Sequence, residues 1–242
     1  MRIVSWNCHY GFDANKMQKI KEVCPDTDIF VIQECKKSDF DVLKTEWKFK
    51  NWYGDDQEYS DLGIAVFSNS KNCKIDFTET FNRKFRYVVP YRITVDGKQL
   101  ILFAVWTKPV PFDYDENIAK AISSSEYKEL CSGDAIIIGD FNTGYNKEHP
   151  ERYSDLLKKL KGFTNCSLGT PEEFKETFFY DRKKKMYIND FCFFSDSLYN
   201  RLQNDTPKIK FEIHNAWETN EYQQKRWCDL SDHCPIIVDF DL

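Results

Sequence analysis

Short apolar runs recur along the whole chain, and turn-forming residues separate them. Runs rich in β-branched and aromatic residues are typical of buried strands. The pattern predicts strands over 2–6, 28–33, 62–68, 87–95, 100–106, 135–139, 186–194, 209–214 and 235–240. Asp96-Gly97, between two of these runs, indicates a hairpin because both residues accept left-handed backbone angles.

Apolar residues at helical spacing predict helices over 15–24, 116–131 and 151–160. Pro25 ends the first helix, and Gly133 and Gly162 lie just past the other two. Strands that alternate with helices indicate an α/β fold. Because no linker rich in Gly, Ser or Pro divides the chain and no short repeat is visible, we expect residues 1–242 to form one domain.

The composition favours a folded protein over a disordered chain, since 41% of the 242 residues are hydrophobic and 16% are aromatic. The net charge is −5 and the sequence pI is about 5.5. Such a surface repels a nucleic-acid backbone, so a polyanionic substrate requires a local basic patch or a metal ion.

The nine cysteines follow no zinc-binding spacing, and several lie in apolar runs. They are typical of buried free thiols in a reducing compartment. No run approaches the ~20 apolar residues of a membrane helix, and the start of the sequence, MRIVSWN, lacks an apolar signal stretch. We therefore expect a cytoplasmic protein without a membrane partner, and we take a monomer as the working expectation.

Polar side chains repeatedly stand at the ends of the predicted strands. A single one is usually a turn former, but strand ends are rigid and meet at one edge of a sheet, where a catalytic cluster can form. The residues are Asn7, Glu34, Asp140, Asn142, Asp190, Asp232 and His233.

This mixture of side chains suits phosphate chemistry. Carboxylate and amide oxygens are hard ligands that fit Mg²⁺ or Mn²⁺, and a divalent ion neutralises phosphate charge. A histidine beside carboxylates can hold a proton near neutral pH. Since neither GxSxG nor a P-loop is present, the set favours hydrolysis of a phosphate ester by an activated water.

Five segments occur in one order along nearly the whole chain: IVSWN, VIQE, IIIGDFN, NDFCFFSD and SDHCPI. With them the sequence resembles the endonuclease/exonuclease/phosphatase family, which includes exonuclease III, deoxyribonuclease I and inositol polyphosphate phosphatases. The resemblance implies a four-layer sandwich of two mixed β-sheets flanked by helices, as in deoxyribonuclease I. It also implies a metal-dependent phosphoesterase with its site at one end of the sandwich.

The resemblance assigns metal and water roles to four positions. Glu34 would be the principal ligand, and Asn7 and Asp232 would help to hold the ion or its waters. Asp140 would orient or deprotonate the attacking water.

Three further roles concern the phosphate. Asn142 would donate a hydrogen bond to a phosphoryl oxygen, and His233 would stabilise the developing charge. Asp190 would pair with His233. Asn189 stands where many members have an apolar residue, so it is either solvent-facing or changes the partner of His233. We favour Asp190 because it keeps its spacing to the following run.

Some family members carry one more catalytic side chain after the middle strand. Tyr114 is the candidate here, and its alternative role is to pack at a helix start. We expect Lys108 and Arg86 to bind substrate, and Trp227 to stack on a base, whereas Trp106 belongs to the core.

The remaining basic and histidine residues are less informative. The run 182–185 is most simply a solvated loop, although basic residues around a phosphate site would also suit a single-strand binder. We expect His9 and His149 on the surface without obvious partners, and we expect His214 to be structural.

The leading hypothesis for the substrate is a phosphodiester in nucleic acid, motivated by these motifs and the basic clusters. The alternative is a small phosphoester such as a cyclic nucleotide, a sugar phosphate or a lipid headgroup. The acidic pI and the lack of spare chain for DNA-gripping insertions favour that alternative. A non-catalytic binding module would have lost part of the main motifs, and these are intact.

Overall fold

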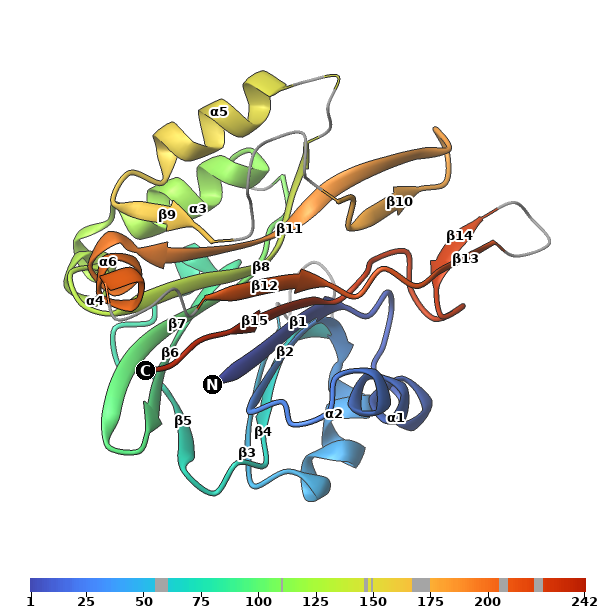
Figure 1. Cartoon of the computed structure of the whole chain (residues 1–242), viewed down its shortest axis with the longest axis horizontal. Helices are drawn as coiled ribbons and strands as arrows, with labels where there is room; N and C mark the ends of the chain where they lie inside the picture. Colours follow the sequence, from blue (N-terminus) through green and yellow to red (C-terminus); the bar gives the residue numbers. More distant parts are fainter. Residues whose placement is uncertain are drawn as a thin grey trace.

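Two β-sheets packed face to face form the centre of the molecule, and helices cover their outer faces (Figure 1). The computed structural model describes residues 1–54, 61–109, 111–145, 148, 150–166, 175–204, 209–219 and 224–242. The four layers confirm the predicted α/β sandwich with two mixed sheets.

The first sheet has the strand order β12-β15-β1-β2-β4-β3 within the described ranges. Only β1 and β2 run parallel, and the other neighbours are antiparallel. The first and last long strands of the chain are therefore neighbours. The strands are β1 (Arg2–Asn7), β2 (Ile29–Lys36), β3 (Phe49–Gly54), β4 (Leu62–Ser68), β12 (Lys210–Ile213) and β15 (Ile236–Asp239).

The second sheet has the order β10-β11-β8-β7-β6-β5, with β9 beside β11. Here β7 and β8 are the parallel pair. A separate ribbon, β13 (Trp217–Thr219) with β14 (Lys225–Trp227), projects beyond the first sheet (Figure 1). The strands are β5 (Cys73–Phe77), β6 (Val88–Val95), β7 (Lys98–Trp106), β8 (Ala135–Tyr145), β9 (Phe163–Asn165), β10 (Phe178–Tyr180) and β11 (Lys185–Ser195).

Strand alternation divides the apolar residues between the central and outer layers. On β8, Ile136 and Ile138 pack between the sheets, whereas Ile137 faces the helices on the other side. The helices α1 (Ala14–Val23) and α2 (Lys37–Leu43) cover the first sheet.

The helices of the second sheet differ from the prediction in one respect. The expected helix over 116–131 is two helices, because the Ser124 hydroxyl accepts a hydrogen bond from the Tyr127 amide at 3.2 Å and caps a new start. The other elements are α3 (Tyr114–Ile122), α4 (Ser125–Cys131), α5 (Pro150–Lys159), α6 (Asp196–Asn204), and the short helices η1 (Lys44–Glu46) and η2 (Arg83–Phe85).

Every predicted strand is present, with ends shifted by a few residues. The sequence pattern missed α2, α6 and the short or half-exposed strands, whose alternation is weak. Among the described residues, no helix has the length and apolar character needed to cross a bilayer.

Candidate active site

The side chains predicted to form a catalytic cluster meet at one end of the two sheets. Asn7 at the end of β1 connects them, since its Nδ2 donates to Glu34 Oε1 at 3.1 Å and to Asp140 Oδ2 at 2.9 Å. Glu34 belongs to the first sheet and Asp140 to the second. One buried amide therefore joins the two halves of the sandwich at the cluster.

A bulge in β2 directs Glu34 toward this cluster. Ile32 and Cys35 pair with Ala65 and Gly63 on β4, so β2 contains one extra residue. Glu34 has a φ of 58°, which is uncommon for a residue other than glycine. Bulges and left-handed residues of this kind reorient side chains beside active sites.

The GDFN segment of β8 is shaped by its close approach to β7. Gly139 has a φ of 144°, and a Cβ built on it would lie 2.1 Å from the Val105 carbonyl oxygen. Only glycine fits there. The pairing of β8 with β11 becomes irregular past Asp140, and Asn142 has a φ of 51°.

Asn142 is organised around the fully buried carboxylate of Asp140. Its backbone N–H donates to Asp140 Oδ1 at 2.9 Å, and its Nδ2 donates to Asp140 Oδ2 at 2.8 Å. The same Nδ2 donates to the Thr107 carbonyl at 3.1 Å, so both of its N–H groups have protein acceptors. Donation to a phosphoryl oxygen stays a prediction that requires one of these bonds to exchange.

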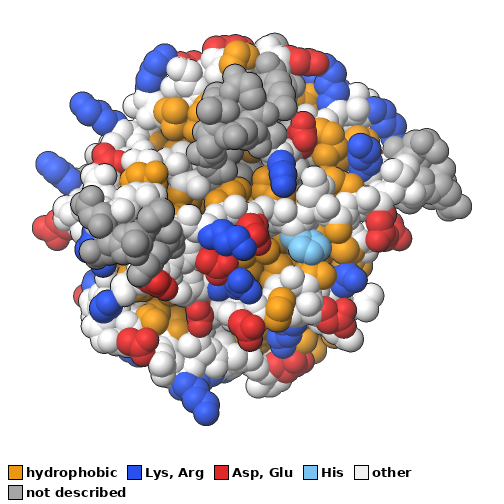
Figure 2. All heavy atoms as spheres, viewed as in Figure 1, with side chains coloured by type: hydrophobic (Ala, Val, Ile, Leu, Met, Phe, Trp, Pro, Cys, Tyr) orange, Lys and Arg blue, Asp and Glu red, His pale blue; other side chains and the backbone are white. Residues whose placement is uncertain are grey.

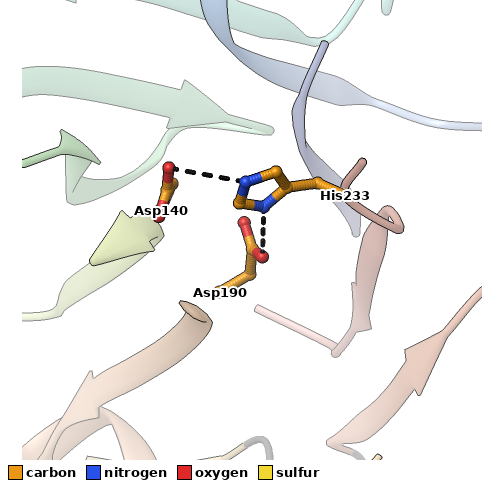
Figure 3. Close-up of side chains that lie close together, drawn as sticks. All are labelled: Asp140, Asp190 and His233. Atoms are coloured by element: carbon orange, nitrogen blue, oxygen red, sulfur yellow. Dashed lines mark hydrogen bonds and ion pairs between the residues drawn. The ribbon is translucent and has the colours of Figure 1, made fainter. Parts of the chain in front are cut away.

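His233 is buried between two carboxylates (Figure 3). Its Nδ1 lies 2.9 Å from Asp190 Oδ2, and its Nε2 lies 4.0 Å from Asp140 Oδ2. Asn189 is also buried, and its Oδ1 accepts a hydrogen bond from the Gly144 amide at 2.9 Å. Asp190 is therefore the contact of His233, and a solvent-facing Asn189 is wrong.

The pKa values of His233 and Asp140 suit proton transfer. Burial opposes charge on the imidazole, but the attraction of Asp190 and Asp140 raises the pKa of His233 to about 10. Burial raises the pKa of Asp140 to about 7, against the opposing attraction of His233. At neutral pH His233 is thus a charged donor, and Asp140 can accept a proton.

The oxygen-rich side of the cluster fits a hard divalent cation. Glu34 offers two carboxylate oxygens beside Asn7, and Oε2 accepts a hydrogen bond from the Tyr10 amide at 3.0 Å. Ligand atoms of Asp140, Asp190 and His233 lie within 4.8 Å of one another. However, a protonated His233 repels a cation, so the oxygens of Glu34 and Asn7 are the better donors.

Asp232 has a partner that sequence reasoning missed. His9 Nδ1 lies 3.0 Å from Asp232 Oδ1, so the expectation that His9 has no obvious partner is wrong. Burial opposes ionisation of Asp232, but the His9 hydrogen bond and the charge of His233 lower its pKa. The position of His9 two residues after Asn7 was the available signal, because the end of β1 enters the cluster.

The proposed base-stacking role of Trp227 is wrong. The side chain is fully buried, its ring centroid lies 4.8 Å from that of Trp6, and its Nε1 donates to His214 Nδ1 at 3.1 Å. Strand β14 pairs with β13 and turns the indole inward. Trp106 belongs to the core, as predicted.

The other peripheral candidates lie on segments around the cluster. Lys108 follows Thr107, and the Thr107 amide donates to the Asp140 carbonyl at 3.0 Å. The Nζ of Lys108 lies 3.9 Å from the Trp106 ring centroid. Arg86 caps η2, and Tyr114 is the half-exposed first residue of α3. Residues 182–184 lie in an exposed turn and Lys185 begins β11, whereas His149 lies outside the described residues.

Comparison with known proteins connects this geometry to a fold. No protein-family model and no curated protein sequence matches the chain. Three solved structures illustrate the similarity, each covering 100% of this chain. The endonuclease domain of TRAS1, a telomere-specific non-LTR retrotransposon, has a TM-score of 0.68 at 15% identity over 98% of its own length.

The other two structures come from bacteria, and each is covered over 100% of its own length. An endonuclease/exonuclease/phosphatase family protein from Leptotrichia buccalis has a TM-score of 0.62 at 17% identity. A mannosyl-6-phosphatase from Bacteroides thetaiotaomicron has a TM-score of 0.61 at 17% identity. This chain therefore has the fold of the endonuclease/exonuclease/phosphatase proteins.

Proposed function

We propose that the chain is a divalent-metal-dependent phosphoesterase that hydrolyses phosphodiester bonds in nucleic acid by means of an activated water. The observation that carries the proposal is one hydrogen-bonded cluster, built from both sheets, in which Asp140 lies between Asn7 and Asn142 and faces the His233–Asp190 pair. In this proposal residues 1–242 act as a single catalytic domain.

Asp140 acts as the general base in this proposal. Its pKa of about 7 lets it take a proton from water near neutral pH, where a base is most effective. Asn7 and Asn142 hold its carboxylate in a fixed orientation through bonds of 2.9 and 2.8 Å. As Asp140 takes the proton, the water oxygen attacks phosphorus and the P–O bond to the leaving oxygen breaks. The leaving alkoxide then takes up a proton from solvent.

His233 stabilises the negative charge that develops on the phosphoryl oxygens. Asp190 occupies Nδ1, which orients the ring and leaves Nε2–H as the donor toward the substrate. A pKa of about 10 keeps this donor charged throughout the neutral range.

Mg²⁺ or Mn²⁺ is the proposed cofactor. Glu34 would be its main protein ligand, supported by Asn7 and Asp232. The bound ion supplies neutralisation of phosphate charge. This proposal is supported by the carboxylate oxygens of Glu34 beside Asn7, because hard oxygen ligands suit these two ions.

Nucleic acid is the favoured substrate class because the chain shares its fold with the TRAS1 endonuclease domain. It also has a lysine, Lys108, directly after Thr107, whose amide donates to the Asp140 carbonyl. Lys and Arg side chains alternate with Asp and Glu on the face shown in Figure 2. The charge of a bound phosphate must therefore be balanced by groups next to the cluster, and not by the surface as a whole. The likeness to a mannosyl-6-phosphatase makes a sugar phosphate the substrate to test as the rival.

The test is hydrolysis of single-stranded, duplex and abasic oligonucleotides, a cyclic nucleotide and mannose 6-phosphate, with Mg²⁺, Mn²⁺ or chelator. We expect metal-dependent oligonucleotide cleavage. Asp140→Asn should lower kcat by about 10²–10⁴-fold, the usual contribution of a general base. His233→Ala should lower it by about 10²–10³-fold, the effect of losing a donor to the developing charge.

Asp155→Asn is the matched control, because this aspartate is exposed on α5 and pairs only locally with Lys158 at 3.0 Å. Its kcat should equal that of the wild type. Cleavage that persists in chelator, or in Asp140→Asn, would refute the mechanism. Hydrolysis of the small esters alone would transfer the proposal to the rival substrate class.

We also propose a cytoplasmic monomer. All nine cysteines are free, and Cys8, Cys35 and Cys234 among them are buried near the cluster, which suits a reducing compartment. Sedimentation of the purified chain tests the monomer, and fractionation of cells tests the location.

A further inference from the structure

The loop from Cys8 to Gly11 is held rigidly against the cluster. The Tyr10 amide donates to Glu34 Oε2 at 3.0 Å, and the Gly11 amide donates to the Glu34 carbonyl at 2.9 Å. The His9 amide donates to Asn7 Oδ1 at 3.0 Å. Lys16 Nζ donates to the carbonyls of His9 and Gly11, each at 3.0 Å. The loop is thereby fixed from β1, β2 and α1.

The loop keeps an unfavourable backbone conformation. His9 and Tyr10 have φ values of 52° and 58°, so two successive residues with side chains occupy the left-handed region. Glycine would adopt these angles at no steric cost, whereas other residues are destabilised there. Strain that the surroundings maintain is typical of functional positions. The side chains of His9 and Tyr10 are therefore the features to explain.

His9 contacts Asp232, whereas most of the Tyr10 surface is exposed to solvent. The Tyr10 residue is 63% exposed, although its backbone contacts Glu34. The His9 ring lies 4.9 Å from the Tyr10 ring at an interplanar angle of 78°. An aromatic side chain thus stands at the rim of the cluster, because the Tyr10 amide and the Asn7 amide both donate to the carboxylate of Glu34.

We propose that Tyr10 is a specificity-determining residue whose ring stacks on a nucleobase next to the scissile phosphate. This inference rests on the proposed function and narrows its substrate to phosphodiesters that carry a base. A net charge of −5 gives the protein little general attraction for a phosphate backbone. Stacking supplies affinity without positive charge, and every base offers a flat face for it.

The test compares the dinucleotide thymidylyl-thymidine with two analogues that lack one thymine, on either side of the phosphate. For Tyr10→Ala we expect the selectivity ratio, kcat/KM for the dinucleotide over kcat/KM for the analogue, to fall by roughly 5- to 150-fold. The change should lie in KM, and Tyr10→Phe should keep the wild-type ratio. Val42→Ala, which alters an exposed side chain on α2, is the control.

A binding measurement separates failure of this inference from failure of the proposed function. Calorimetry in Ca²⁺ compares thymidine 5′-phosphate with 2-deoxyribose 5-phosphate, and no turnover is needed. Weaker binding of the nucleotide alone in Tyr10→Ala supports the stacking role. Equal losses for both ligands, or none, overturn it, and so does a wild-type selectivity ratio near one.

A single-stranded oligonucleotide as a third substrate identifies the source of the base. A kcat/KM above that of the dinucleotide indicates nucleic acid, and a lower value indicates free nucleotides. Cleavage of all substrates with no dependence on the base would leave the phosphoesterase proposal intact and refute the role of Tyr10.

Discussion

Individual residues at the cluster have backbone conformations or charges that are unfavourable unless their surroundings stabilise them. Glu34, Asn142, His9 and Tyr10 all have positive φ values, and Gly139 has one that permits close approach of β8 to β7. Each of the four residues with a side chain costs stability on the order of 1–3 kcal/mol in this conformation. These four residues all take part in hydrogen bonds of the cluster, so its geometry, and not packing alone, determines their conformations.

Titration of His233 is the first prediction at this scale. Since its folded pKa of about 10 exceeds the ordinary value of 6.5, protonation of His233 stabilises the fold. This contribution is complete below pH 6.5 and is lost as the pH rises through 10. Nitrogen NMR of the metal-free protein should show a charged imidazole at pH 8. Asp190→Asn should lower that pKa and reduce the free energy of unfolding most at low pH.

An imidazole that titrates near its ordinary pKa in the wild type would contradict this assignment. His214→Gln provides the control spectrum, because His214 accepts its hydrogen bond from Trp227 and does not belong to the Asp190 pair.

Gly139→Ala is a second prediction. A Cβ at this position would lie 2.1 Å from the Val105 carbonyl oxygen, and the φ of 144° excludes alanine without strain. We expect the free energy of unfolding to fall by roughly 2–4 kcal/mol, from backbone strain and overpacking. Urea unfolding measures it. Gly133→Ala, where a Cβ would meet nothing within 4 Å, should have little effect.

At the scale of elements, the ends of strands position the side chains of the cluster, and a helix holds one of these strand ends in place. The helix α1 is capped by Asp13, whose side chain accepts from the Lys16 amide at 2.9 Å. The Lys16 ammonium then reaches back to the loop that follows β1. The first helix therefore holds the end of the first strand as well as covering the sheet.

Lys16→Met tests this connection. The carbonyls of His9 and Gly11 would lose a charged donor, so the free energy of unfolding should fall by about 1.5–3 kcal/mol. Hydrogen exchange at the Tyr10 and Gly11 amides should accelerate. Lys19→Met, on the same helix, should change the stability by less than about 0.5 kcal/mol. Equal effects of the two variants would show that the helix, and not the loop contact, was altered.

The sequence predicted the long buried strands and most of the cluster because both signals are local. Apolar runs such as the one before Gly139 predict a strand, and the polar residues directly after them predict the site. The contacts of His9 and the burial of Trp227 were not predictable in this way. Both depend on contacts between segments that are distant in the sequence. Trp227 has polar neighbours in the sequence, although its side chain is buried in the structure.

At the scale of the whole molecule, the cluster joins the two sheets. Carboxylates from each sheet approach one amide, Asn7, so their mutual repulsion acts across the sandwich. A bound cation would relieve that repulsion. The stability of the entire fold should therefore depend on the metal.

Added Mg²⁺ should raise the melting temperature of the wild type. At about 100 times Kd the gain is about 2.7 kcal/mol, which corresponds to roughly 5–10 °C for a chain of this size. Scanning calorimetry measures it, and chelator should reverse it. Glu34→Gln should abolish the shift, whereas Glu151→Gln on α5 should retain it. A melting temperature independent of Mg²⁺ would argue against a preformed site.

The pairing of β1 with β15 has a consequence for biosynthesis. Arg2 lies opposite Asp239, and Ser5 lies opposite Ile236. Strand β1 therefore cannot complete its pairing until β15 has been synthesised. Until residues 231–239 have been synthesised, β1 lacks one of its two neighbours, and Asn7 lacks the Ser231 hydroxyl that donates to its carbonyl at 2.7 Å. If the proposed function holds, a nascent chain could not act on nucleic acid before β15 has been made.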